Sequence, residues 1–178
     1  LAAMRKVLGS HITQKGSYQN EDITRFDFSH FSKASDTELQ QIEDIVNEKI
    51  RQNIPLEYRV DVPIEQAIKM GATATFGEKY GDFVRMVIFD PQFSIELCGG
   101  THVTHTGEIG LFKFISESSV SAGVRRVEAL TGEKAMQYVN EQLSLINETK
   151  SILNAKIKEV SINGVEWLEP LREMINVA

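Results

Sequence analysis

The stretch that decides the fold class is residues 83–97, which read FVRMVIF (83–89), DPQ (90–92) and FSIEL (93–97). The first run is almost continuously apolar, which predicts a buried strand, and the second run predicts another. The turn residues Asp90 and Pro91 separate them. Strands joined by so short a loop pair antiparallel, because a parallel crossover needs a much longer connection.

Further elements are expected on both sides of this strand pair. Strands are predicted at 23–28, 58–62, 111–116 and 124–130, and the stretch at 11–17 is expected to begin like a strand and run into a turn. Helices are predicted at 1–8, 36–53 and 64–69, the second opened by the capping box Ser35-x-x-Glu38. Several strands follow one another over short loops. The sequence therefore predicts an α+β domain, an antiparallel or mixed sheet with packed helices.

The pattern changes after Thr131-Gly132. Apolar residues then recur at steps of three and four, which predicts an amphipathic helix with a short heptad-like seam: Met136, Val139, Leu143, Ile146 and Leu153. We expect a domain at 1–132, a linker helix at 133–154 and, at 155–178, the partial start of a C-terminal region with a turn at Asn163-Gly164. The sequence begins without Met, which suggests a fragment.

Composition narrows the class of protein. The 178 residues include 19 Lys and Arg against 25 Asp and Glu, a net charge of −6. A globally basic nucleic-acid binder is therefore not expected, and any RNA contact needs a local patch. No apolar run approaches the about 20 residues that span a membrane. Cys98 is the single cysteine, so an internal disulfide is impossible, and we expect a cytoplasmic protein.

The segment from Cys98 to His102, CGGTH, is the sharpest local feature. A thiolate and an imidazole this close can bind a metal such as zinc, and two glycines allow the tight turn that brings them together. His105 is a candidate third ligand. Two alternatives stay open: a buried structural Cys beside a surface His, and a nucleophilic Cys98 with His102 or His105 as its base.

Three other places carry polar groups of interest. Residues 77–82, GEKYGD, form either a solvated turn or a loop that lines a pocket or contacts phosphate. Arg125 and Arg126 are successive strand residues that point to opposite faces, so one can bind an RNA phosphate while the other pairs with an acid such as Glu128. Asp27 and His30 could form a catalytic pair, although turn chemistry explains Asp27 and its neighbour Ser29 more simply.

Six segments together resemble alanyl-tRNA synthetases, in the order in which that family has them. They are residues 14–17 (QKGS), 25–31 (RFDFSHF), 77–82 (GEKYGD), 96–103 (ELCGGTHV), 116–120 (SESSV) and 122–129 (AGVRRVEA). They cover about residues 1–132, which resemble the editing domain of that family. The same fold serves the editing domain of threonyl-tRNA synthetases and freestanding trans-editing proteins.

This resemblance implies a zinc site. In the family, an H-x-x-x-H pair on a helix and the Cys and His of C-x-x-x-H hold the metal. Cys98 and His102 match the second pair. The resemblance places the first pair immediately upstream of Leu1, on the helix whose end is residues 1–8. We therefore expect zinc in the full-length protein and weak or no zinc binding by this chain.

The resemblance also implies a reaction, hydrolysis of the ester that joins serine or glycine to the 3′ end of alanine tRNA. A synthetic site that accepts alanine discriminates poorly against such small differences, so a second, hydrolytic site is needed. Zinc would position the substrate or a water and polarise the reacting centre. Gln14, Cys98 and His102 are the expected catalytic residues, and Thr13, Lys15 and Arg126 the expected substrate contacts.

The implied partners are the acceptor end of alanine tRNA and the rest of the synthetase chain. The aminoacylation region of the family is absent from these residues, so we expect neither an ATP site here nor charging of tRNA. Two alternative functions remain. One is a freestanding trans-editing deacylase, and the other is a noncatalytic module that binds tRNA without turning it over.

Overall fold

The computed structural model describes residues 1–74 and 79–162, with side-chain burial given up to residue 154. The first two residues of the 77–82 segment and the expected turn at Asn163-Gly164 lie outside this part. The chain divides into two units, Leu1–Ala135 and Met136–Ala178.

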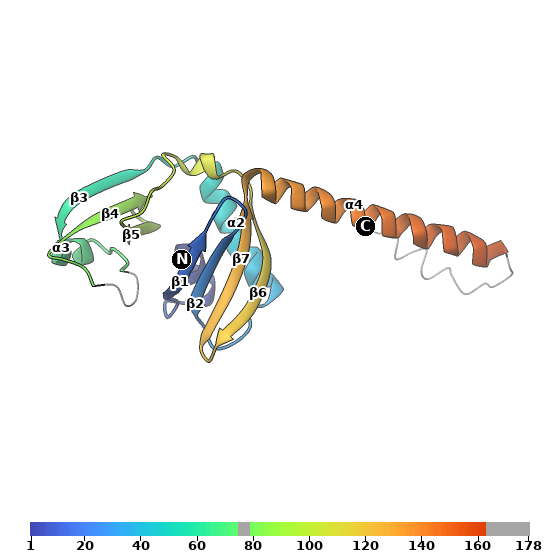
Figure 1. The fold of residues 1–178 in the computed structure, drawn as a ribbon, viewed down its shortest axis with the longest axis horizontal. Helices are drawn as coiled ribbons and strands as arrows, with labels where there is room; N and C mark the ends of the chain where they lie inside the picture. Colours follow the sequence, from blue (N-terminus) through green and yellow to red (C-terminus); the bar gives the residue numbers. More distant parts are fainter. Residues whose placement is uncertain (75–78, 163–178) are drawn as a thin grey trace. The chain divides into compact units, whose positions relative to one another are not determined.

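A four-stranded antiparallel sheet forms the larger layer of the first unit (Figure 1). Its strand order is β1-β2-β7-β6, with β1 at Gln14–Gln19, β2 at Thr24–Ser29, β7 at Val124–Thr131 and β6 at Phe112–Ser121. The predicted α+β class is confirmed. Two differences are local. The stretch at 11–17, expected to run into a turn, instead continues into β1, and β6 runs five residues past its expected end because a tight turn at Gly123 pairs Ser121 with Val124.

Two helices cover one face of this sheet, α1 at Ala2–Leu8 and α2 at Asp36–Arg51. The predicted capping box opens α2: the Glu38 amide donates to Ser35 Oγ (3.2 Å), and the Ser35 amide donates to Glu38 Oε2 (2.8 Å). The helices and the sheet enclose one apolar core, whose buried members are Ala3, Met4, Ile12, Phe28, Ile42 and Val127.

A second, three-stranded antiparallel sheet has the order β3-β4-β5, with β3 at Glu57–Pro63, β4 at Phe83–Phe89 and β5 at Ser94–Leu97. Helix α3 at Ile64–Lys69 contacts it, and Gly71, at a φ of 88° that favours glycine, follows the helix. This layer encloses its own core of Ala67, Ala72, Val84, Met86, Ile88 and Leu97. The strand pair expected at 83–97 is confirmed.

Helix α4 at Gly132–Ile162 begins in the first unit and makes up the described part of the second. It continues past residue 154, where we expected the linker helix to end. Its apolar seam residues Met136, Leu143, Ile146 and Leu153 are each about half exposed. Among the described residues, no helix is both long and apolar enough to cross a membrane.

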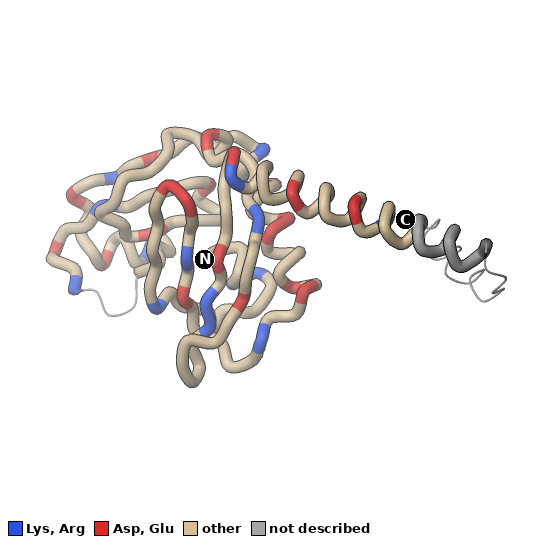
Figure 2. Tube along the Cα trace, turned by 45° about the vertical axis from the view of Figure 1, so that its right-hand side comes forward, with Lys and Arg blue, Asp and Glu red and all other residues tan. Residues whose placement is uncertain are grey.

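Charged residues of both signs alternate along the strands and loops of the first unit (Figure 2). Some of these residues form ion pairs between neighbouring strands, such as Arg125 with Glu117 and Arg126 with Asp27. Positive and negative residues are thus mixed over this unit. An anion would therefore have to bind to individual Lys or Arg side chains.

Candidate functional site

The loop from Cys98 to His102 follows β5 and is held by Arg85 of the neighbouring strand β4. The Cys98 amide donates to the carbonyl oxygen of Arg85 (3.3 Å), which continues the strand pairing by one residue. The Arg85 guanidinium donates back from Nε to the Cys98 carbonyl (2.8 Å) and from Nη2 to the Gly100 carbonyl. One side chain therefore fixes two carbonyl groups of the loop.

The two reactive side chains of the loop are half-buried and each has a polar partner. The Gly100 amide donates to Cys98 Sγ at 3.4 Å. The hydroxyl of Tyr58, from β3, lies 3.2 Å from His102 Nδ1, and the two rings meet edge to face with centroids 6.0 Å apart. Because Nδ1 of His102 already contacts Tyr58, Nε2 is the ring nitrogen that remains to contact a ligand.

The surroundings of His102 favour its neutral form. Burial, and then the positive charge of Arg85, lower the pKa of His102 below its ordinary 6.5, while the carboxylate of Glu96 opposes them. Near neutral pH the imidazole therefore keeps a lone pair. A neutral imidazole can accept a proton or coordinate a metal.

His102 lines a large cavity of about 790 Å³ in the first unit. The wall carries aromatic rings from several strands, including Phe26, Phe89 and Phe112, and polar groups from Thr101 and Glu108. A largely apolar cavity with a few polar groups is typical of small-ligand sites. Leu1, just before α1, lines the same cavity.

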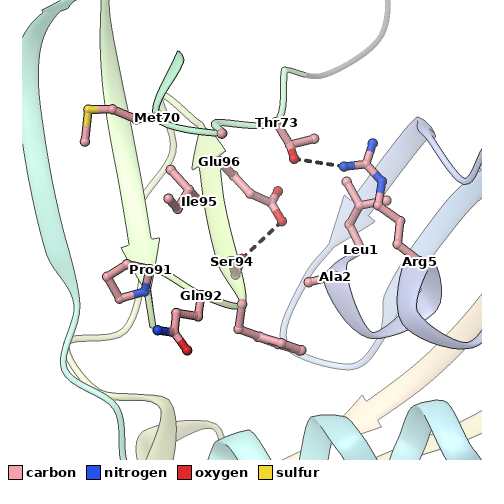
Figure 3. A pocket seen from close by; sticks show the side chains of 12 residues that line it. Leu1, Ala2, Arg5, Met70, Thr73, Pro91, Gln92, Ser94, Ile95 and Glu96 are labelled. Atoms are coloured by element: carbon pink, nitrogen blue, oxygen red, sulfur yellow. Dashed lines mark hydrogen bonds between the residues drawn. The ribbon is translucent and has the colours of Figure 1, made fainter. Parts of the chain in front are cut away.

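A smaller cavity of about 250 Å³ lies where α1 meets the second sheet (Figure 3). Arg5 of α1 donates to Thr73 Oγ1 (2.9 Å) and to the Ile12 carbonyl (2.8 Å), which ties the helix to the segment beside β5. Glu96 of β5 accepts from Ser94 Oγ (3.3 Å) and lines this cavity with Leu1. Helix α1 is thus anchored next to the strand that leads into Cys98.

The described residues do not complete a zinc site. They contain no group of three His, Cys, Asp or Glu side chains placed to share a metal ion. His105, the candidate third ligand, instead lies against Thr104 Oγ1 (3.0 Å) and Glu108 (3.6 Å). Tetrahedral zinc takes four ligands, or three and a water, so Cys98 and His102 supply half a set at most.

The other expected site residues lie on the first sheet. Thr13 Oγ1 contacts Ser29 Oγ (3.0 Å), and the Gln14 amide donates to Ser17 Oγ (3.2 Å). Among the described residues that line the large cavity, neither Thr13, Gln14 nor Lys15 appears, whereas His102 does. The structure thus groups Cys98 and His102 on one loop, and the roles of Thr13, Gln14 and Lys15 stay predictions.

The two adjacent arginines point to opposite faces, as predicted, and both form ion pairs. Arg126 makes a bidentate pair with Asp27 (2.6 and 2.8 Å), and Arg125 makes one with Glu117 (2.6 Å for both bonds). Glu128, the acid we expected as partner, accepts instead from Ser116 Oγ (2.8 Å). A phosphate contact by Arg126 stays a prediction, and it would have to compete with Asp27.

The suggested Asp27–His30 pair does not form. Asp27 is taken by Arg126, because the antiparallel register places the two residues opposite each other. His30 instead stacks on His11, with Nδ1 of His30 3.0 Å from Nε2 of His11.

Sequence patterns alone missed Arg85 and Tyr58. Both lie in strands whose alternation predicted only secondary structure. The available signal was the charge of Arg85 inside a seven-residue apolar strand, since a lone charge in such a run needs a specific partner.

Comparison with known proteins now gives these features a context. Residues 79–128 match the family model described as the threonyl and alanyl tRNA synthetase second additional domain. This stretch contains the Cys98–His102 loop, Arg85 and the strands β4 to β6. The matched stretch of the chain, residues 79–128, belongs to this family.

Within that family, the chain is similar to alanine–tRNA ligases. It is 55% identical over 174 residues to the ligase of Cytophaga hutchinsonii, covering 98% of this chain and 19% of that protein. It is 53% identical over 149 residues to that of Salinibacter ruber (84% and 15%) and 50% identical over 173 residues to that of Thermotoga maritima (97% and 20%). The chain spans about a fifth of the length of these relatives.

Proposed function

We propose that the chain is the editing region of an alanine–tRNA ligase and takes part in hydrolysing the ester of serine or glycine on alanine tRNA. The observation that carries this proposal is the half-buried pair Cys98 and His102, in the family-matched stretch, with His102 at the wall of the large cavity. The partners are then the acceptor end of the tRNA and the rest of the ligase. The place of action is the cytoplasm.

The cavity supports a nucleoside-sized ligand. Its aromatic wall suits the apolar faces of a terminal adenosine. His102, kept neutral, offers its lone pair to a water or to the ester-bearing end. Arg126 and Lys15 are retained as proposed phosphate contacts, and Thr13 and Gln14 as proposed contacts to the aminoacyl group.

Zinc belongs to this proposal only as a group that Cys98 and His102 would share with ligands outside the described residues. The position of Leu1 at the cavity that His102 lines supports an upstream continuation of α1 as their source. Two His at i and i+4 lie on one helical face, so such a pair could reach the same cavity.

The test is a deacylation assay on Ser-tRNA(Ala) with added zinc. Two proteins are compared: this chain, and a version lengthened before Leu1 by about ten helical residues that carry an H-x-x-x-H pair, roughly three turns. Cys98→Ala and His102→Ala are made in the lengthened protein. His105→Ala is the matched control, because His105 contacts Thr104 and Glu108.

Hydrolysis by the lengthened protein that is lost in the Cys98 and His102 variants, and kept in the His105 variant, supports the proposal. Binding of tRNA by a folded, lengthened protein that never hydrolyses the ester would replace it with the noncatalytic binding module.

A further inference from the structure

The Cys98–His102 loop has little packing of its own. It contains Gly99 and Gly100, and a Cβ added at Gly99 would meet no atom of the described residues within 4 Å. Glycine pairs lose much conformational freedom on ordering. Something outside the loop must therefore set its conformation.

Arg85 supplies the required contacts. Its fork donates to the Cys98 carbonyl at 2.8 Å and to the Gly100 carbonyl, on either side of Gly99. The same guanidinium lies over the ring of Tyr58, 4.9 Å from the centroid, a distance typical of a cation–π contact. The Tyr58 hydroxyl then lies 3.2 Å from His102 Nδ1. A continuous chain of contacts thus runs from the Cys98 backbone through Arg85 and Tyr58 to the His102 ring.

We propose that Arg85 and Tyr58 are positioning residues that fix the Cys98–His102 loop and hold His102 through Nδ1, so that Nε2 is the nitrogen presented to substrate or ligand. This inference rests on the proposed function, because it concerns the same two side chains. Arg85 sets the backbone of the loop. Tyr58 sets the orientation and the tautomer of the imidazole, as partners of functional His residues commonly do.

The side-chain chemistry supports these separate roles. A planar guanidinium with several donors can bind two carbonyls and stack on a ring at once, which a Lys ammonium cannot do. Arg59, one position after Tyr58 on β3, provides the contrast: it pairs with Glu57 at 2.5 Å, and both side chains are largely exposed.

The first experiment tests Tyr58 by nitrogen NMR of the imidazole rings. The sequence has four His, so ¹⁵N-His labelling gives four pairs of ring-nitrogen signals, and His102→Ala assigns one pair. Tyr58→Phe removes the hydroxyl and keeps the ring under Arg85. We expect the two ring-nitrogen shifts of His102 to converge in Tyr58→Phe, because the imidazole then samples both tautomers. Tyr18→Phe, at a Tyr of similar exposure (48% against 43%), should leave them unchanged.

The second experiment tests Arg85 through the single thiol. Cys98 is the only cysteine, so the rate of alkylation by iodoacetamide reports the loop alone. We expect Arg85→Gln to change that rate by about fivefold, the factor for losing one hydrogen bond of ordinary strength. Arg85→Lys should not restore the original rate, since Lys lacks the fork. Arg59→Gln is the control and should leave the rate unchanged.

Neither readout uses tRNA or metal, so failure of the deacylase proposal leaves both interpretable. Unchanged His102 shifts in a folded Tyr58→Phe protein, or an unchanged alkylation rate in a folded Arg85→Gln or Arg85→Lys protein, would overturn the positioning role. If Arg85→Gln does not fold, Arg85→Lys and Tyr58→Phe still decide the matter.

Discussion

The two sheets of the first unit use arginine in different ways. In the four-stranded sheet, Arg125 and Arg126 each bind a carboxylate on a neighbouring strand through two bonds. In the three-stranded sheet, Arg85 binds the carbonyls of a loop and lies over a ring. Pairing between strands stabilises a scaffold, whereas binding loop carbonyls fixes the position of reactive groups.

The two sheets also differ in the size of the apolar core that each one covers. The core of the four-stranded sheet contains the large side chain of Phe28, fully buried, and is covered by a helix of 16 residues. The core of the three-stranded sheet includes two alanines and is covered by a helix of six residues. More apolar area buried means more stabilisation. We therefore assign most of the stability to the first sheet and the candidate site to the second.

The largest expected effect comes from breaking the stronger core. Phe28→Ala should lower the free energy of unfolding by about 3–5 kcal/mol, because it removes a fully buried aromatic ring and leaves a cavity. Urea denaturation measures the change. Phe31→Ala is the matched control, since Phe31 is 92% exposed, and it should change the stability by less than about 0.5 kcal/mol. Equal losses from both variants would contradict this assignment of the core.

The next effect tests the ion pairs of the scaffold. Glu117 is almost fully buried and Arg125 mostly so, with 2% and 15% of the side chains exposed. Glu117→Gln should cost about 2–3 kcal/mol, because it leaves a partly buried guanidinium without its carboxylate. Glu57→Gln breaks the exposed pair with Arg59 on the other sheet and should cost at most about 0.5 kcal/mol. A similar loss in both would mean that burial does not separate the two pairs.

Local patterns predicted most of the elements. The capping box at Ser35 and the apolar strand at 83–89 each act through near neighbours, so sequence spacing was enough to place them. The length of β6 was underestimated because its second half, at 117–121, is polar and is stabilised by pairing with β7. Long-range pairing of this kind leaves little trace in a single sequence.

The candidate site was predictable only in its loop. Cys98 and His102 are neighbours along the chain and were found by spacing. Tyr58 lies 44 positions before His102, and Arg85 lies 13 before Cys98. Their contacts exist because β3, β4 and β5 pair in a particular register. The identity of Arg126's partner, Asp27, depends on the same kind of long-range register.

A smaller effect should separate the two sheets by function. Ser35→Ala removes the cap of α2 and should cost about 1 kcal/mol, because amides in the first turn lose their acceptor. Helix α2 covers the four-stranded sheet, so the alkylation rate of Cys98 should stay the same while the unfolding midpoint falls. Thr37→Ala, exposed and two residues further along, is the control and should not destabilise the protein. Faster alkylation of Cys98 in the Ser35→Ala protein would show that the site depends on α2.

The smallest expected effect concerns the link between the two layers. Lys49 of α2 pairs with Asp90 in the β4–β5 turn (2.9 Å), and both side chains are partly exposed. The hydrogen bond from Lys49, and then that from the Gln92 amide, hold the pKa of Asp90 below its ordinary 3.8. A carboxyl whose pKa is lowered by folding stabilises the protein above its unfolded pKa, and the contribution is lost as pH falls through the folded value.

Asp90→Asn should therefore lower stability slightly at neutral pH, and the difference from the natural chain should shrink as pH falls below about 4. Asn is the right substitution, because residue 90 has a φ of 62° and Asn tolerates that conformation. Asp44→Asn is the control for the loss of one negative charge, because the Asp44 carboxylate accepts a hydrogen bond from Gln40 on the same helix, α2. A stability difference that stays constant from neutral pH to pH about 3 would mean that the Asp90 carboxylate does not stabilise the contact between the layers. Other contacts would then stabilise it, such as Lys49 over the Phe93 ring (4.8 Å) and Arg5 with Thr73.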